Sequence, residues 1–209
     1  MKSTNTNAQN PTIRVAAIIS LVTNPPLLSV LVMFLISVTK SGPVSTLAGW
    51  WIEVVAFLVL LPVVYLYIRA AVSKSQIKFP LGIIGFLKQH PLDVLVMSIV
   101  FGIPCMVILT LFQAPPMMYG TLAALLITSI IIATVYKFYR VSYHVAATII
   151  LVTMTIITWG NIYSWLVVLV PIVGWAKYRL QEHSVAQMLS AAALSASVTT
   201  VTLWVIGIF

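Results

Sequence analysis

The chain contains an apolar run, residues 145–176, that carries no charged side chain. About 20 apolar residues are enough for an α-helix to cross the hydrocarbon core of a bilayer. The run is therefore too long for one membrane-spanning helix. Gly160 and Asn161 lie near its middle, where such residues favour a turn. We expect two short helices that meet at this pair as a hairpin.

The composition of the whole chain agrees with this feature. Of the 209 residues, 61% are hydrophobic and only 7% are charged, whereas soluble domains carry roughly 25% charged residues. A soluble fold of this length could not cover so much apolar surface with so few polar side chains. The composition predicts an integral membrane protein. The single cysteine, Cys105, excludes an intramolecular disulfide.

Apolar runs of span length recur along the sequence, and they predict an all-α, polytopic membrane bundle with about seven (six to seven) transmembrane helices. The first is expected to bend at Pro25-Pro26. We divide the chain into a disordered polar tail over 1–12, two transmembrane helices over 13–68 and a transmembrane core over 69–209. The expected spans are 15–38, 47–68, 92–112, 118–138, 142–159, 161–177 and 185–208.

The distribution of charge predicts the orientation of this bundle. The chain has 11 Lys and Arg against 3 Asp and Glu. With seven spans, the N-terminal tail and the segments 69–91, 137–144 and 177–184 lie on one side, together with ten of the eleven cations. Positive loops are retained in the cytoplasm, so we expect a multi-pass cell-membrane protein with its N-terminus and this face cytoplasmic. Nucleic acid is not an expected partner, because no soluble basic domain is present.

All three histidines map to the same basic face, at the predicted ends of spans. An ionisable side chain at the edge of a membrane span is costly and marks a candidate site. Two segments combine a histidine with cations and hydrogen-bonding groups, which is what phosphoryl transfer requires. The first holds Lys137, Arg140, Ser142 and His144, and the second holds Lys177, Arg179, His183 and Gln187. The alternative is that both are ordinary basic loops with histidines present by chance.

Helical spacing makes a further prediction for the second segment. His183 and Gln187 are four residues apart, so on a helix they would share one face and could point at one ligand. The spacing therefore predicts that His183 and Gln187 can form a hydrogen bond or bind one ligand together.

These two segments resemble motifs of the type 2 phosphatidic acid phosphatase superfamily, which are membrane lipid phosphatases and diphosphatases. The resemblance rests on S-Y-H at 142–144 and K-Y-R-L-Q-E-H-S-V-A-Q at 177–187, and it covers roughly residues 69–208. Lys177, His183 and Gln187 take the basic, histidine and acidic positions of the third motif, with Gln as in one branch of the family. K-Q-H-P at 88–91 lies where a first motif is expected, but it lacks the Arg-Pro of the family.

The resemblance implies that His183 attacks phosphorus and that His144 protonates the leaving oxygen and then activates water. Gln187 would orient His183. The phosphate oxygens would be held by Lys177, Arg179, Ser142, Arg140, Lys88 and His90. No metal or other cofactor is expected, because Glu53, Asp93 and Glu182 are scattered along the chain and too few for a carboxylate-held Mg²⁺.

The sequence thus predicts a hydrolase that removes phosphate from a polyprenyl phosphate or diphosphate or from a phosphatidate-like lipid. The substrate and the surrounding membrane lipids are the expected partners, and oligomeric state is left open. Two alternatives remain. One is a non-catalytic relative that binds or translocates lipids, and the other is a small transporter that uses Glu53.

Overall fold

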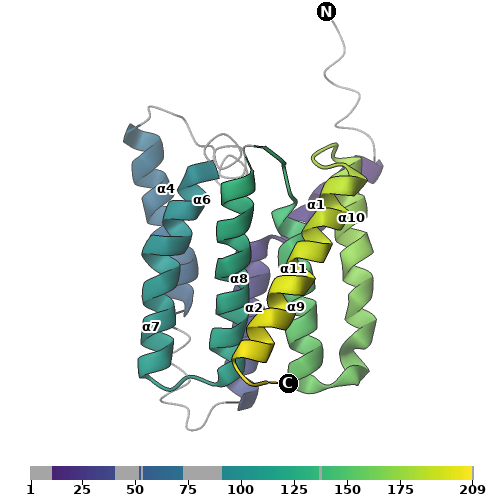
Figure 1. Ribbon diagram of the computed structural model, residues 1–209. Helices are drawn as coiled ribbons and strands as arrows, with labels where there is room; N and C mark the ends of the chain where they lie inside the picture. Colours follow the sequence, from purple (N-terminus) through teal and green to yellow (C-terminus); the bar gives the residue numbers. More distant parts are fainter. Residues whose placement is uncertain (1–10, 41–51, 53, 73–90, 137, 209) are drawn as a thin grey trace, which may run out of the picture.

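The computed structural model describes residues 11–40, 52, 54–72, 91–136 and 138–208, and the regular elements in these ranges are all helical. The prediction of an all-α fold is confirmed for this part of the chain. Figure 1 shows the helices side by side in a bundle, with the chain's C-terminus at one end. The beginning of the described chain lies at the opposite end, which also carries the connections α8–α9 and α10–α11.

The first predicted span is a broken helix. Helix α1 (Pro11–Val22) and helix α2 (Pro25–Lys40) meet at an angle of 47°. Proline lacks an amide hydrogen and fits the first position of a helix, so Pro25 begins α2 while it interrupts α1. The predicted bend at Pro25-Pro26 is confirmed. The predicted tail over 1–12 was two residues too long, because Pro11 and Thr12 already belong to α1. Residues 1–10 lie outside the described ranges.

The next two helical stretches each contain a π-helical segment. The first consists of η2 (Ala56–Leu60) and α4 (Leu61–Val72), and the second of α6 (Pro91–Met97), η3 (Ser98–Gly102) and α7 (Ile103–Leu111). The predicted span 92–112 agrees with the second stretch. The predicted span 47–68 begins among undescribed residues. Its helix continues to Val72, so Arg69, which was expected to begin a polar connection, lies in the helix.

Helix α8 (Pro116–Val135) follows a tight turn in which Gln113 has a left-handed backbone, and helix α9 (Tyr143–Trp159) returns the chain antiparallel to it. The helix predicted over 118–138 ends three residues early, at Val135. Helix α9 packs against α2, α8, α10 and α11, and much of its surface is buried. It is therefore the central helix of the bundle, held by four neighbouring helices.

The predicted hairpin is confirmed at Gly160. Its φ of +97° is a left-handed backbone conformation that ends α9, and only glycine adopts it without strain. The chain then returns through the 3₁₀ segment η4 (Asn161–Val168) and α10 (Leu169–Arg179) before helix α11 (Val185–Val205). The returning arm thus differs from the expected α-helix in its first half. The hairpin carries the chain back to the end of the bundle where α9 began (Figure 1).

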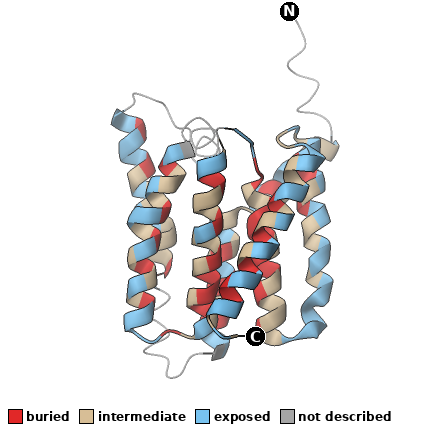
Figure 2. Ribbon diagram, in the orientation of Figure 1, coloured by how far each residue is buried: buried red, intermediate tan, exposed pale blue. Residues whose placement is uncertain are grey.

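Three of the described helices are long and apolar enough to cross a membrane. They are Leu92–Leu111, Pro116–Val135 and Val185–Val205, and the bent pair Pro11–Val22 and Pro25–Thr39 would add a fourth span. Ala56–Val72 and Tyr143–Trp159 are shorter apolar helices. In Figure 2 buried residues lie mainly on the faces where helices meet, while the outward faces are exposed. Many exposed side chains are large and apolar, which is unusual for a surface in contact with water.

Candidate functional site

Two connections at one end of the bundle carry the candidate site. Residues 136–142 join α8 to α9, and residues 180–184 join α10 to α11. His144 is in the first turn of α9, and His183 is in the second connection, two residues before α11 begins. The α9–α10 hairpin therefore brings the two histidine-bearing segments, which are 39 positions apart in sequence, to the same end of the fold.

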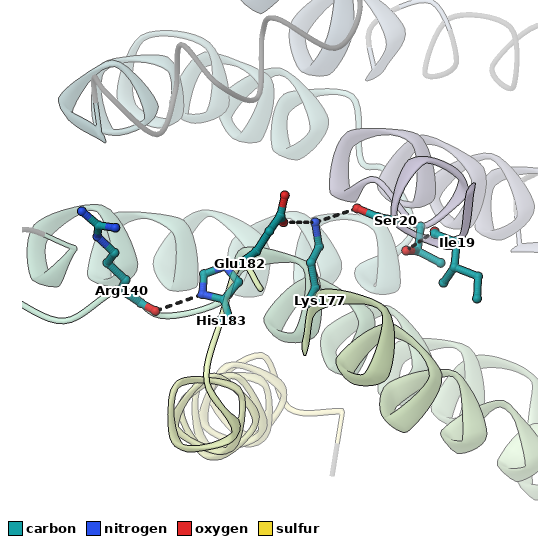
Figure 3. A network of polar contacts seen from close by, with 7 residues as sticks. Ile19, Ser20, Arg140, Lys177, Glu182 and His183 are labelled. Carbon is teal, nitrogen blue, oxygen red and sulfur yellow. Dashed lines mark hydrogen bonds and ion pairs between the residues drawn. The ribbon is translucent and has the colours of Figure 1, made fainter. Parts of the chain in front are cut away.

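The imidazole of His183 is held by the backbone of the first connection. Its Nδ1 atom lies 3.2 Å from the carbonyl oxygen of Arg140 (Figure 3). A carbonyl oxygen can only accept a hydrogen bond, so Nδ1 carries the proton in this contact and Nε2 keeps a free lone pair. A neutral ring in this tautomer presents Nε2 as a nucleophile.

The surroundings of His183 favour the neutral ring. Burial lowers the pKa of its imidazole below the ordinary value of 6.5, because the charged form loses hydration. The Arg140 carbonyl and the Glu182 carboxylate act in the opposite direction, and Lys177 lowers the pKa further. Burial is the largest of these influences, so the pKa of His183 is lowered overall and the neutral ring is favoured.

Lys177 does not point toward His183. Helix α10 ends in a Schellman motif, in which Gln181 takes a left-handed backbone (φ +55°) and the Glu182 amide donates to the Lys177 carbonyl at 3.1 Å. This geometry places the side chains of Lys177 and Glu182 together. The Lys177 ammonium lies 2.8 Å from a Glu182 carboxylate oxygen and donates to Ser20 Oγ of α1 at 2.6 Å (Figure 3). Only 1% of the Lys177 side chain is exposed, and its hydrogen bond to Ser20 links α10 to α1.

Arg179 shares a hollow with His183. An open hollow of about 410 Å³ is lined by Tyr178, Arg179, Gln181, His183 and Ser184. The structure thus brings together one predicted phosphate-binding cation, Arg179, and the predicted nucleophile. Lys177 does not line this hollow.

Arg140 contributes its backbone and not its charge to the contact with His183. Its side chain is exposed, and in Figure 3 the guanidinium points away from the imidazole. Its predicted role in holding phosphate has no support in this contact.

Ser142 begins helix α9 without capping it. It is the N-cap residue, its side chain is fully buried, and its Oγ has no hydrogen-bond partner. A buried hydroxyl without a partner is costly, and the N-terminus of a helix attracts anions. His144, in the same turn, is half-buried. Ser142 and His144 therefore form a second set of predicted site residues at the end of the bundle that carries His183.

Gln187 caps a helix and does not share a helix face with His183. Ser184 is the N-cap of α11, so His183 precedes the helix and the predicted i, i+4 relation between His183 and Gln187 was wrong. The Gln187 Oε1 accepts from the Ser184 amide at 3.0 Å, and the Gln187 amide donates to Ser184 Oγ at 3.3 Å, which makes a capping box. The predicted hydrogen bond between the two side chains is nevertheless supported, because a side-chain hydrogen bond with Gln187 raises the pKa of the His183 imidazole, as the smallest of the influences on it.

The remaining predicted positions lie outside the described residues. These are Lys88 and His90 of the first motif, Lys137 of the first constellation, and Glu53, on which the transporter alternative rests. Among the described residues, no three His, Cys, Asp or Glu side chains are grouped closely enough to hold a metal ion.

Sequence reasoning missed Ser20 and Glu182 as partners of Lys177. The approach of Glu182 had a local signal, because the Schellman motif at a helix C-terminus brings the C3 and C″ positions, here Lys177 and Glu182, close together. Ser20 had no such local signal, since it is 157 residues from Lys177.

A second polar cluster, between α4 and α6, was also not predicted. The buried Asp93 accepts a hydrogen bond from Tyr65 Oη at 2.9 Å and pairs with Arg69 Nε at 3.4 Å.

No family model, curated protein or solved structure matches the chain.

Proposed function

We propose that the chain is a multi-pass membrane protein that hydrolyses a lipid phosphate or diphosphate through a phosphohistidine intermediate, without a metal. In this proposal it is a divergent member of the type 2 phosphatidic acid phosphatase superfamily. About seven spans cross the membrane, and the N-terminus and the histidine-bearing end face the cytoplasm.

The observation that carries the proposal is the contact between His183 Nδ1 and the Arg140 carbonyl, at 3.2 Å. A histidine attacks phosphorus through a neutral nitrogen with a free lone pair. The carbonyl selects the tautomer that leaves Nε2 in this state, and burial keeps the ring neutral. Moreover, the carbonyl belongs to the connection that leads into Ser142 and His144, so the contact ties the two predicted parts of the site together.

The chemistry proceeds in two displacements. His183 Nε2 forms a bond to phosphorus as the bond to the lipid oxygen breaks, and His144 gives a proton to that oxygen. His144 then takes a proton from water, whose oxygen attacks the phosphohistidine and releases inorganic phosphate. Arg179 and the N-terminus of α9, with Ser142, hold the phosphate oxygens. Lys177 stabilises the connection and does not touch phosphate.

Exposed apolar surface supports the membrane part of the proposal. The α6–α7 stretch, Leu92–Leu111, is strongly apolar, and only 17% of its most apolar part is buried inside the protein. Side chains such as Leu111, Phe112 and Ile162 are more than half exposed. In water such a surface would be strongly unfavourable, whereas lipid solvates it.

The decisive experiment is phosphate release by detergent-purified protein in excess EDTA, from a panel of polyprenyl phosphates, polyprenyl diphosphates and phosphatidates. Wild type is compared with His183→Ala. Release in EDTA that His183→Ala abolishes supports both the enzyme class and the nucleophile. Absence of release from every substrate, by protein that elutes as a single folded species, contradicts the proposal.

A second function is favoured by one observation, the burial of Lys177. Lys177, which takes the basic position of the third motif, pairs with Glu182 and donates a hydrogen bond to Ser20. Among the described residues that line the hollow around His183, Arg179 is then the cation. Such a site can bind a lipid phosphate without turning it over. Head-group affinity of the folded protein together with no phosphate release distinguishes this function from hydrolysis.

A further inference from the structure

A cavity of about 190 Å³ lies inside the bundle, next to the first turn of α9. Its wall includes Tyr143, the residue between Ser142 and His144, followed by Ala146 and Ala147 one turn further along. The cavity and the N-terminus of α9, where Ser142 and His144 lie, therefore share the first turn of this helix. A lipid whose head group lies at the N-terminus of α9 has this space directly along the helix.

The cavity exists because several helices depart from regular geometry at its wall. Pro25 and Pro26, at the break between α1 and α2, line it. Phe57 and Leu58 line it from the π-helical segment η2, and Ser98 and Gly102 line it from the π-helical segment η3. Isolated π-helical turns are rare and occur frequently at functional sites. Two of them and a proline break meet at this one cavity.

Small side chains keep the cavity open. Gly102 is the clearest case, because a Cβ atom there would lie 2.1 Å from Leu126 Cδ2, a side chain that also lines the cavity. A larger residue at 102 must push Leu126 aside. Ala147 lines the wall from α9, and leucine or phenylalanine in its place would fill the space.

The lining selects an apolar ligand of limited width. Most of the wall is aliphatic or aromatic, and the hydroxyls of Ser29 and Ser98 are already bonded to carbonyls of their own helices. Thr128 adds one buried hydroxyl to the wall that has no hydrogen-bond partner. An engineered apolar cavity of about 150 Å³ binds one benzene molecule, so about 190 Å³ suits an apolar group of similar width. This is room for the first part of one hydrocarbon chain and not for two chains side by side.

We propose that this cavity binds the proximal part of a single hydrocarbon chain, so that the preferred substrates are single-chain lipid phosphates and not two-chain phosphatidates. This inference rests on the proposed function for the position of the head group. The chain enters between helices from the bilayer, and its burial places the phosphate at Ser142, Arg179 and His183. Prenyl and acyl chains share the necessary chemistry, an unbranched or narrow apolar tail bearing one phosphate.

The first test compares kcat/KM for dodecyl phosphate, farnesyl phosphate and oleoyl lysophosphatidate with that for dioleoyl phosphatidate, all in mixed micelles of one detergent. The single-chain substrates should be preferred by at least about tenfold, the equivalent of burying roughly two additional methylenes. Equal or better turnover of dioleoyl phosphatidate overturns the inference while leaving the proposed function intact.

The second test fills the cavity. Ala147→Leu should lower the preference for dodecyl phosphate over butyl phosphate by about tenfold or more, because it removes the space for the proximal methylenes. Gly102→Ala adds a Cβ to the cavity wall and displaces Leu126, which also lines it, so it should act in the same direction and serves if Ala147→Leu does not fold. Ala193→Leu, on the exposed face of α11, is the matched control and should leave the preference unchanged. A preference that survives both cavity variants contradicts the inference.

A binding measurement separates failure of the inference from failure of the proposed function. Equilibrium binding of radiolabelled dodecyl phosphate to His183→Ala protein, with and without Ala147→Leu, needs no turnover. If wild type releases no phosphate but Ala147→Leu weakens this binding, the hydrolase is wrong and the chain site stands. If binding is insensitive to Ala147→Leu, the chain site is wrong whether or not the enzyme is active.

Discussion

Two helix starts in this protein look alike in sequence and differ in structure. The N-cap residue is Ser142 in helix α9 and Ser184 in helix α11, and a histidine lies within two residues of each. The α11 start is satisfied from within, since Ser184 and Gln187 form a capping box. The side chain of Ser142 makes no cap hydrogen bond, and its buried hydroxyl has no partner.

This difference assigns separate tasks to the two starts. A helix terminus that is already capped by its own side chains offers little to a ligand, whereas an uncapped one retains its attraction for an anion. Under the proposed function, the α9 start is therefore the place for phosphate, and the capped α11 start supports His183, whose Nδ1 contacts the Arg140 carbonyl. In the proposed mechanism the motif at 177–187 then supplies the nucleophile His183 and one cation for phosphate, Arg179.

The largest expected effect is on the nucleophile. His183→Ala should lower kcat/KM by more than about 10³-fold, since no other group takes over the covalent step. His144→Ala should be similarly inactive on alkyl phosphates but should recover much of its rate on p-nitrophenyl phosphate, whose leaving group needs no proton. Phosphate release in EDTA measures both. An active His183→Ala variant would mean that the α11 start does not carry the nucleophile.

The buried ion pair gives the next largest effect, and on stability. Lys177→Met leaves the Glu182 carboxylate without its cation, and unfolding free energy should fall by about 2–3 kcal/mol, less than for a fully enclosed pair because Glu182 is 22% exposed. The double variant Lys177→Met/Glu182→Gln should recover most of this loss.

Activity of that double variant tests the role of Lys177. If Lys177 only ties α10 to α1, the double variant retains turnover with an unchanged KM. If Lys177 also holds phosphate, KM for the substrate rises in the single and double variants alike. Thermal unfolding in detergent and steady-state kinetics on the same preparations provide the two readouts.

A smaller, paired effect compares the two serines directly. Ser184→Ala breaks the capping box and should cost about 1 kcal/mol of stability with little change in KM. Ser142→Ala removes no hydrogen bond from the free protein, so its stability should be nearly unchanged, but KM should rise by about tenfold because a donor to phosphate is lost. The reverse pattern would exchange the roles given to the two helix starts.

The smallest effect is a shift in pH dependence. Because burial lowers the pKa of His183, the unfolded chain binds more protons than the folded one below pH 6.5. The corresponding stability is fully present above pH 6.5 and declines as the pH falls from there toward the folded-state pKa. The acidic limb of kcat/KM should likewise lie below pH 6.5. Glu182→Gln removes an influence that raises this pKa, so it should move the limb to lower pH, and movement to higher pH would contradict the assignment.

Much of the fold was predictable from local sequence. Apolar runs of span length, interrupted at Pro25 and Gly160, placed the helices within a few residues of their observed ends, because chain breakers act on their own backbone. The errors fall at helix ends, such as Val135, where capping and packing compete. The predicted site was less complete: the approach of His183 to the α9 connection followed from the hairpin, whereas the roles of Gln187 and Lys177 did not.

By itself, then, the sequence determined the helical class, the hairpin at Gly160 and the gathering of both histidine-bearing segments at one end. These depend on hydrophobicity and on residues that act locally. The tertiary structure alone decided where the long polar side chains point. Lys177 turns toward Ser20, 157 positions away in sequence, because packing of α1 against α10 creates a buried acceptor there. No spacing within the motif encodes that partner, since it arises only when distant helices meet.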